Sequence, residues 1–223
     1  MNHRSRFLFG VLLILAEGAA ARAAQEPSQP AQPAPIVQPG APGEASRTIS
    51  ADEATDLSGV QYTDADVEFM QGMISHHAQA LEMTDLLGSR TRSPEMRKLS
   101  LRIELSQEDE IQMMQTWLGA RGRKVTDVHA HHAKGAHLMP GMLTPEEMES
   151  LRKADGVAFD RLFLELMIKH HQGALTMVED LLAKPGAGQD SDIFAFISDI
   201  TADQSMEIDR MGAMLAAIKE PSR

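Results

Sequence analysis

The chain has 223 residues, 21 basic and 32 acidic side chains, a formal charge of −11, and no cysteine. The acidic excess disfavours nucleic acids and anionic lipid surfaces as partners, and the lack of cysteine excludes disulfides and thiolate metal ligands. Methionine is abundant, with 15 residues. These methionines serve either as soft metal ligands or as adaptable side chains of a hydrophobic core.

Residues 1–23 have the organisation of a secretory signal peptide. Arg4 and Arg6 precede an apolar run at 7–16, and the Ala-Arg-Ala sequence at 21–23 is suitable for cleavage. The run is too short to span a membrane. Cleavage would remove three arginines and one glutamate, which moves the formal charge from −11 to −13. We therefore expect an exported protein, periplasmic or secreted, with no membrane insertion once the signal is cleaved.

Residues 24–48 contain six prolines and almost no large apolar side chains. This composition predicts a disordered or polyproline-like linker that carries no chemistry of its own. A helical bundle is expected to follow over residues 49–220. Its first stretch, 49–62, is ambiguous and is compatible with a short helix.

The first pair of long helices has clear start signals. Thr63 with Asp66 three residues later forms a capping-box pattern, which predicts a helix over 64–88. Ser93 followed by a proline predicts a second helix that ends near residue 118. These two helices would form an antiparallel hairpin.

A second pair of helices follows an irregular loop rich in His and Met at 128–142. Thr144, with a proline and a glutamate in register, predicts a helix to residue 183 with a break near 155–156. A last helix is expected over 190–218. No alternating strand pattern is visible, so the sequence predicts an all-α protein.

The two hairpins repeat each other, with repeat 1 at about 63–120 and repeat 2 at about 144–218. At an offset of 94, nine residues of the first helices are identical: Asp66/Asp160, Phe69/Phe163, Met73/Met167, Ile74/Ile168, His76/His170, His77/His171, Ala80/Ala174, Leu81/Leu175 and Met83/Met177. The second helices match at an offset of 97, including Gln107/Gln204 and Glu110/Glu207. Two antiparallel hairpins close most simply into a four-helix bundle.

These duplicated motifs, together with the Met139-Pro-Gly-Met142 turn, resemble the DUF305 family over roughly residues 60–218. The resemblance implies a ferritin-like helical bundle in an exported bacterial protein. Some members of this family are associated with copper or silver handling in the periplasm, so the resemblance also implies soft-metal binding and copper-handling periplasmic proteins as possible partners.

Imidazole and thioether groups share one face of each first helix. On a helical wheel, His76 and His77 point about 100° apart, with Met73 between them. We therefore expect one histidine of each pair to face inward and the other to face a helix interface or solvent. The candidate ligands of copper or silver are Met73, His76, His77, Met83, Met167, His170, His171 and Met177.

The second helices place polar side chains on their apolar faces, where burial is costly unless they are hydrogen-bonded. The carboxylates of Glu110 and Glu207 are expected to orient histidine rings, as carboxylates do beside metal-bound imidazoles, or to satisfy buried rings with no metal present. The residues expected to support the ligands are Asp66, Gln107, Glu110, Asp160, Gln204 and Glu207.

The loop at 128–142 is a second candidate metal site. Clustered imidazoles suit Cu(II), and thioethers suit Cu(I) or Ag(I). Its candidate ligands are His129, His131, His132, His137, Met139 and Met142. The alternatives are a solvated loop, and methionines that only plug an end of the bundle.

Copper or silver binding and buffering is the function that these patterns favour, with no organic cofactor indicated. A di-iron site is disfavoured because neither histidine pair has a glutamate three residues before it. Two other functions stay open. One is a structural or interaction module whose His-Glu pairs only hold the bundle together, and the other is a His/Glu or metal-dependent enzyme of unknown reaction.

Overall fold

The computed structural model describes residues 34–39, 45–56, 60–129, 132 and 138–218, and the chain divides into two units after Asp56. The predicted signal peptide lies outside the described residues. Residues 49–56 fall in the N-terminal unit and not in the helical bundle.

The N-terminal unit contains a small antiparallel sheet where the sequence predicted a disordered or polyproline-like linker. Strand β1 (Ile36–Gln38) pairs with β2 (Arg47–Ile49), and Ile36 lies opposite Ile49. The β-branched pairs Ile36-Val37 and Thr48-Ile49 favour these strands, a signal that the proline content of the segment obscured. A short helix, α1 (Ala51–Thr55), follows with a capping box from Ser50.

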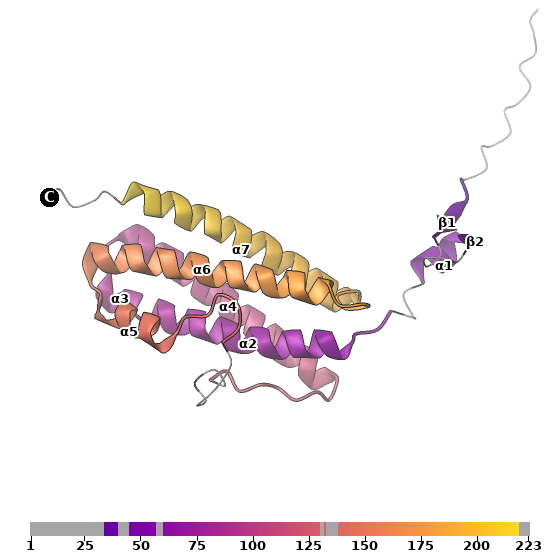
Figure 1. The fold of residues 1–223 in the computed structure, drawn as a ribbon, viewed down its shortest axis with the longest axis horizontal. Coiled ribbons are helices and arrows are strands. Elements are labelled where there is room, and N and C mark those ends of the chain that lie inside the picture. The colour runs from indigo at the N-terminus through magenta and orange to yellow at the C-terminus, as the bar shows by residue number, and fades with distance from the viewer. Residues whose placement is uncertain (1–33, 40–44, 57–59, 130–131, 133–137, 219–223) are drawn as a thin grey trace, which may run out of the picture. The chain divides into compact units, whose positions relative to one another are not determined.

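The second unit is the helical bundle, which confirms the predicted all-α class (Figure 1). Its helices are α2 (Asp64–Asp85), α3 (Leu87–Arg90), α4 (Pro94–Ala120), α5 (Pro145–Lys153), α6 (Gly156–Leu182) and α7 (Ser191–Ala217). Helices α2 and α4 form the first hairpin, α6 and α7 form the second, and α2 packs against α6. Among the described residues, no helix is both long and apolar enough to cross a membrane.

The helix starts lie where the sequence predicts them. Thr63 and Thr144 form complete capping boxes, and Ser93 caps α4 through its hydroxyl. The break between α5 and α6 also lies where it was predicted: Ala154 is extended, and Gly156 has a φ of +59° that favours glycine.

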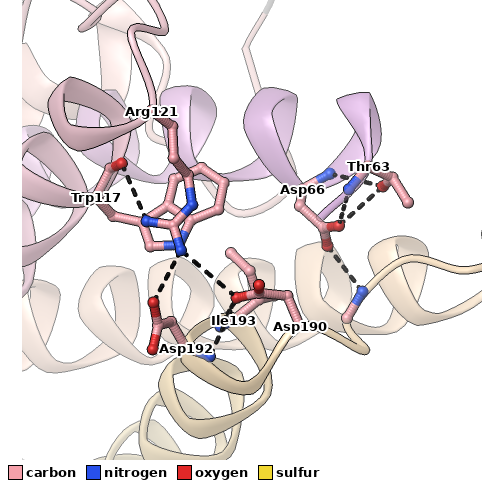
Figure 2. A network of polar contacts seen from close by, with 8 residues as sticks. Thr63, Asp66, Trp117, Arg121, Asp190, Asp192 and Ile193 are labelled. Atoms are coloured by element: carbon pink, nitrogen blue, oxygen red, sulfur yellow. Dashed lines mark hydrogen bonds and ion pairs between the residues drawn. The ribbon is translucent and has the colours of Figure 1, made fainter. Parts of the chain in front are cut away.

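The end of the bundle near the start of α2 is held by polar contacts (Figure 2). The Asp66 carboxylate accepts hydrogen bonds from the backbone and hydroxyl of Thr63 and from the backbone N–H of Gly188 (2.7 Å). Nearby, the Arg121 guanidinium lies over the Trp117 ring and binds Asp192 (2.9 Å). These contacts connect α2, α4 and the start of α7.

The core consists of two apolar clusters separated by a polar layer at mid-length of the four long helices. One cluster includes Met73, Ile111, Met114, Val178 and Ile197. The other includes Met83, Ile103, Phe163, Met167 and Met211. The layer between them, called here the central polar layer, consists of the buried side chains His76, His77, Gln107, His170, His171, Gln204 and Glu207 and the partly buried Glu110.

Candidate metal centre

All four helical histidines lie inside the bundle, each with at most 1% of its surface exposed. The rings of His76 and His170 lie against each other at the contact between α2 and α6, with centroids 3.9 Å apart. His77 and His171 lie on either side, each 6.3 Å from its sequence neighbour. Of the two alternatives expected for the second histidine of each pair, the structure shows the helix interface and not solvent, because His77 faces Glu110 of α4 and His171 faces Glu207 of α7. Both directions on the wheel point into the bundle, because α2 and α6 each have more than one neighbouring helix.

Each histidine donates a hydrogen bond from Nε2. His77 donates to Glu110, and His171 donates to Glu207 at 2.7 Å. His76 donates to the carbonyl oxygen of residue 140 at 2.9 Å, and His170 donates to the carbonyl oxygen of His76 at 3.1 Å. Carbonyl and carboxylate oxygens accept hydrogen bonds, so Nε2 of each ring carries a proton, and a ring in its neutral form has its lone pair on Nδ1.

The central polar layer contains buried acceptor atoms that lack donors. The Nδ1 atoms of His77, His170 and His171 and the Oε1 atoms of Gln107 and Gln204 are buried without a hydrogen-bond partner. Leaving such atoms unpaired costs about 1–3 kcal/mol each. A bound cation would offset this cost at each atom that it contacts.

Burial lowers the pKa of His170 well below its usual value, and the neighbouring rings of His76, His171 and His77 lower it further. Protonation of this ring would place a charge in an apolar interior that already holds three imidazoles. His170 therefore stays neutral in mildly acidic solution, which is the form that binds a metal ion.

The two carboxylates are supported differently. The second oxygen of Glu110 accepts a hydrogen bond from the Ser106 hydroxyl at 3.3 Å. The second oxygen of Glu207 faces the Arg102 guanidinium of α4 at 3.5 Å. The side chain of Glu207 is 4% exposed and that of Glu110 is 15% exposed.

The Met139–Met142 turn lies against the middle of the bundle, and not at its end as one interpretation of the sequence had it. The Gln79 side chain binds the backbone of Leu143, the residue that follows the turn. Its Oε1 accepts from the N–H of Leu143 (2.7 Å), and its Nε2 donates to the carbonyl of Leu143 (3.1 Å). On the other side, Gly141 touches Gly173 of α6, where a Cβ would lie 2.0 Å from the carbonyl oxygen of Pro140. The turn can deliver this oxygen to His76 only because residue 173 has no side chain.

The candidate methionines occupy two kinds of position. Met73 and Met167 are fully buried, one helical turn before the histidines and in opposite apolar clusters. Met139 and Met177 are half-buried and converge over Gly72. Met83 and Met142 are buried as well. Met83 packs in an apolar cluster, about 9 Å along the helix axis from His77 by helical rise.

Asp66 and Asp160 do not take the supporting role that the sequence suggested. Asp66 caps α2 at the end of the bundle, about 15 Å along the helix from His76. Asp160 occupies the equivalent position on α6, ten residues before His170. Their place on the histidine-bearing stripe reflects helical periodicity and not proximity.

The loop histidines are only partly described, because His131 and His137 lie outside the described residues. His129 and His132 meet Glu82 of α2, and one ligand atom of each lies within 4.8 Å of the others. Sequence reasoning missed Glu82, Gln79, Gly173 and the Pro140 carbonyl. Glu82 interrupts the duplication, since the matching residue of repeat 2 is Thr176, and this difference was the available signal.

A known protein family, described as a domain of unknown function (DUF305), matches residues 66–215 of the chain. The chain belongs to the DUF305 family. A DUF305 protein of Streptomyces coelicolor, whose name describes it as secreted, shares the fold with a TM-score of 0.59 and 29% identity, and covers 71% of this chain and 98% of its own.

CopM in its Cu(I)-bound form also has a similar structure, with a TM-score of 0.54 and 28% identity. The match covers 70% of this chain and 97% of CopM, which is also known in Cu(II)-bound and silver-bound forms. An uncharacterized protein of Acanthamoeba polyphaga mimivirus is 36% identical over 56 residues, and the match spans 25% of this chain and 37% of the viral protein.

Proposed function

We propose that this DUF305 protein binds Cu(I), or Ag(I) in its place, in the central polar layer, and that it buffers the ion after export to the periplasm or outside the cell. The ligands would be Nδ1 atoms of the buried histidines, with the thioethers of Met73 and Met167 nearby. Copper-handling proteins of the same compartment would be its exchange partners.

The carrying observation is the arrangement of hydrogen-bond partners around the four rings. Every Nε2 faces an oxygen, and the Nδ1 atoms of His77, His170 and His171 are buried without a hydrogen-bond partner. Metal-bound histidines characteristically donate their other ring N–H to a carboxylate or a backbone carbonyl. Hydrogen bonds alone would account for Nε2 but leave the Nδ1 atoms unexplained.

The choice of a soft monovalent ion rests on the surroundings of the rings. Neutral imidazoles and thioethers between two apolar clusters suit Cu(I) and Ag(I), whereas hard divalent ions prefer oxygen ligands and water. The forms of CopM with Cu(I), Cu(II) and silver support copper or silver as the ion without selecting the oxidation state of copper, and the secreted relative supports export. A binding role fits better than catalysis, because the histidines are at most 1% exposed and a substrate would not reach them.

The test is a titration of the metal-free protein with Ag(I) and Cu(I) against a calibrated competing chelator. We expect a dissociation constant below about 1 μM for the wild type, and a loss of affinity in His170→Asn and His171→Asn. Met83→Leu is the matched control, because it changes a duplicated methionine in an apolar cluster and should leave affinity unchanged. Circular dichroism checks that each variant folds.

The coordinating nitrogen gives a second readout. In NMR spectra that correlate imidazole carbon-bound protons with ring nitrogens, Ag(I) should shift the Nδ1 resonances while Nε2 keeps its proton. Binding weaker than about 1 μM in a folded wild-type protein, or shifts confined to Nε2, would reject the proposal and favour a purely structural role for the His-Glu pairs.

A further inference from the structure

A second cluster of metal-binding groups lies on the surface of the first hairpin, away from the central polar layer. It combines Glu82 of α2 with His129 and His132 of the following loop. The Glu82 Oε1 atom lies 2.6 Å from His132 Nε2 and 3.9 Å from His129 Nδ1. The side chains are 22%, 53% and 68% exposed for Glu82, His132 and His129.

The local backbone brings the two histidines to the same side. The N–H of His132 donates to the carbonyl of His129 at 3.0 Å, and residues three apart in such a turn lie one above the other. Their rings stack with centroids 5.8 Å apart. The N–H of His129 also binds the Asp127 side chain at 2.9 Å, and the Ser75 hydroxyl of α2 binds the Asp127 carbonyl at 3.4 Å. The loop is therefore fastened to α2 beside Glu82.

The separations suit a metal ion. Ligand atoms about 2.0–2.1 Å from a tetrahedral metal lie about 3.3 Å from one another. The two separations from Glu82, 2.6 and 3.9 Å, bracket that value, and the ligand atoms of the two histidines lie within 4.8 Å of each other, so side-chain movements of about 1–2 Å would close the three groups around an ion. Such changes are easy for exposed side chains.

The surrounding charge favours a cation. Asp85 and Glu108 line the same surface groove as Glu82 and His129, and together they give the groove a negative potential. Two imidazoles and one carboxylate form a donor set for Zn(II) or Cu(II), in contrast to the soft donors of the central polar layer.

We infer that Glu82, His129 and His132 form a separate site for a divalent transition-metal ion, Zn(II) or Cu(II), on the surface of the first hairpin. Three protein ligands leave at least one coordination position for water or for a ligand from another molecule, so the ion exchanges readily. The site belongs to repeat 1 alone, since Thr176 replaces Glu82 in repeat 2. It does not depend on metal binding in the central polar layer.

The test uses the full chain and Zn(II) under competition with a calibrated chelator. We expect the His129→Ala, His132→Ala double variant to lose one Zn(II), and Glu82→Gln to weaken that ion by about tenfold or more. Asp85→Asn is the matched control: it removes the same charge from the same groove but no ligand atom, and should change affinity by less than about twofold. Electron paramagnetic resonance of bound Cu(II) should show two coordinated nitrogens that disappear in the double variant.

Two results would overturn the inference. Zn(II) binding that is unchanged in the double variant would show that these histidines are not ligands. An equal loss in Glu82→Gln and Asp85→Asn would show that the groove attracts cations only by its charge. Ag(I) affinity is measured on the same variants and should stay at the wild-type value. If the wild-type protein does not bind Ag(I), the proposal for the central polar layer fails, while the proposal for the surface site is unaffected.

Discussion

The two hairpins carry the same histidine-methionine motif but support it in different ways. In the first hairpin, His76 donates to the carbonyl of an inserted turn and Glu110 is held by a serine hydroxyl. In the second, His170 donates to the backbone of α2 and Glu207 faces an arginine. The rings and their proton positions are thus equivalent, while their supports are not. Duplication has kept the donor atoms alike while one intervening turn broke the symmetry around them.

The sharpest difference is at residues 79 and 173, which are equivalent in the repeats. Gln79 binds the turn through its amide, and Gly173 makes room for it. One side of the turn is therefore held by hydrogen bonds and the other by close backbone packing. The predictions that follow test this comparison, beginning with the largest expected effect.

Replacing Gly173 by Ala should lower the free energy of unfolding by about 2–3 kcal/mol, because the added methyl group overlaps the carbonyl of Pro140 and displaces the turn. Gly212→Ala is the control in α7, where a Cβ meets no atom within 4 Å, and should raise that free energy by about 0.5–1 kcal/mol. Urea unfolding followed by circular dichroism measures both. Equal stability of the two variants would mean that the turn does not rest on Gly173.

Replacing Glu207 by Gln should cost more than the same change at Glu110. Glu207 is the more deeply buried carboxylate and serves both His171 and Arg102, so we expect a loss of about 2–3 kcal/mol against about 1–2 kcal/mol for Glu110→Gln. The measurement is urea unfolding of the metal-free proteins at neutral pH. A larger loss of unfolding free energy in Glu110→Gln would show that the first hairpin, and not the second, depends more strongly on its carboxylate.

Lowering the pH should destabilise the metal-free protein through His170. Its pKa is lowered in the folded state, so below about 6.5 the unfolded chain binds a proton that the folded chain does not. The free energy of unfolding then falls by up to about 1.4 kcal/mol per pH unit, until the lowered pKa is reached. The unfolding free energy of His170→Asn should depend less steeply on pH between 7 and 5. A slope equal to that of the wild type would contradict the prediction.

The smallest effects are expected at the groups that support the two carboxylates. Ser106→Ala removes one hydrogen bond to Glu110 and should cost about 0.5–1 kcal/mol. Arg102→Ala removes a half-exposed ion pair with Glu207 and should cost less than about 1 kcal/mol, decreasing further at high salt. Parallel urea titrations at low and high ionic strength distinguish the two, since only the arginine variant should differ from the wild type in its salt dependence.

The fold was predictable because its signals are local. Thr63, Ser93 and Thr144 cap helices where the sequence predicts them, and the offset between repeats establishes the pair of hairpins. One feature was missed and another was left open. The strands β1 and β2 were missed because the prolines around Ile36 and Val37 dominate the composition. The helical wheel left the second histidine of each pair at a helix interface or in solvent, because a wheel does not contain the number of neighbouring helices that bury it.

The candidate site was only partly predictable. Pairing of histidine with Glu110 and Glu207 follows from the need to satisfy buried polar groups. Asp66 and Asp160 share the stripe but lie about 15 Å from the rings along the helix axis. The helical period gives the direction of a side chain around the axis and not its position along the axis. The contributions of Pro140, Gly173 and Glu82 depend on where a loop lies, and no periodic pattern records that position.

The contact between His76 and the inserted turn has a consequence for mutagenesis. Its acceptor is a main-chain oxygen, which no side-chain replacement at residue 140 deletes. An alanine scan would therefore leave this contact in place and assign residue 140 no role. Its contribution can be exposed only indirectly, by crowding the turn from Gly173 or by releasing it at Gln79. In this protein, a group that fixes the proton of a candidate ligand is encoded at positions that are far from it in the sequence.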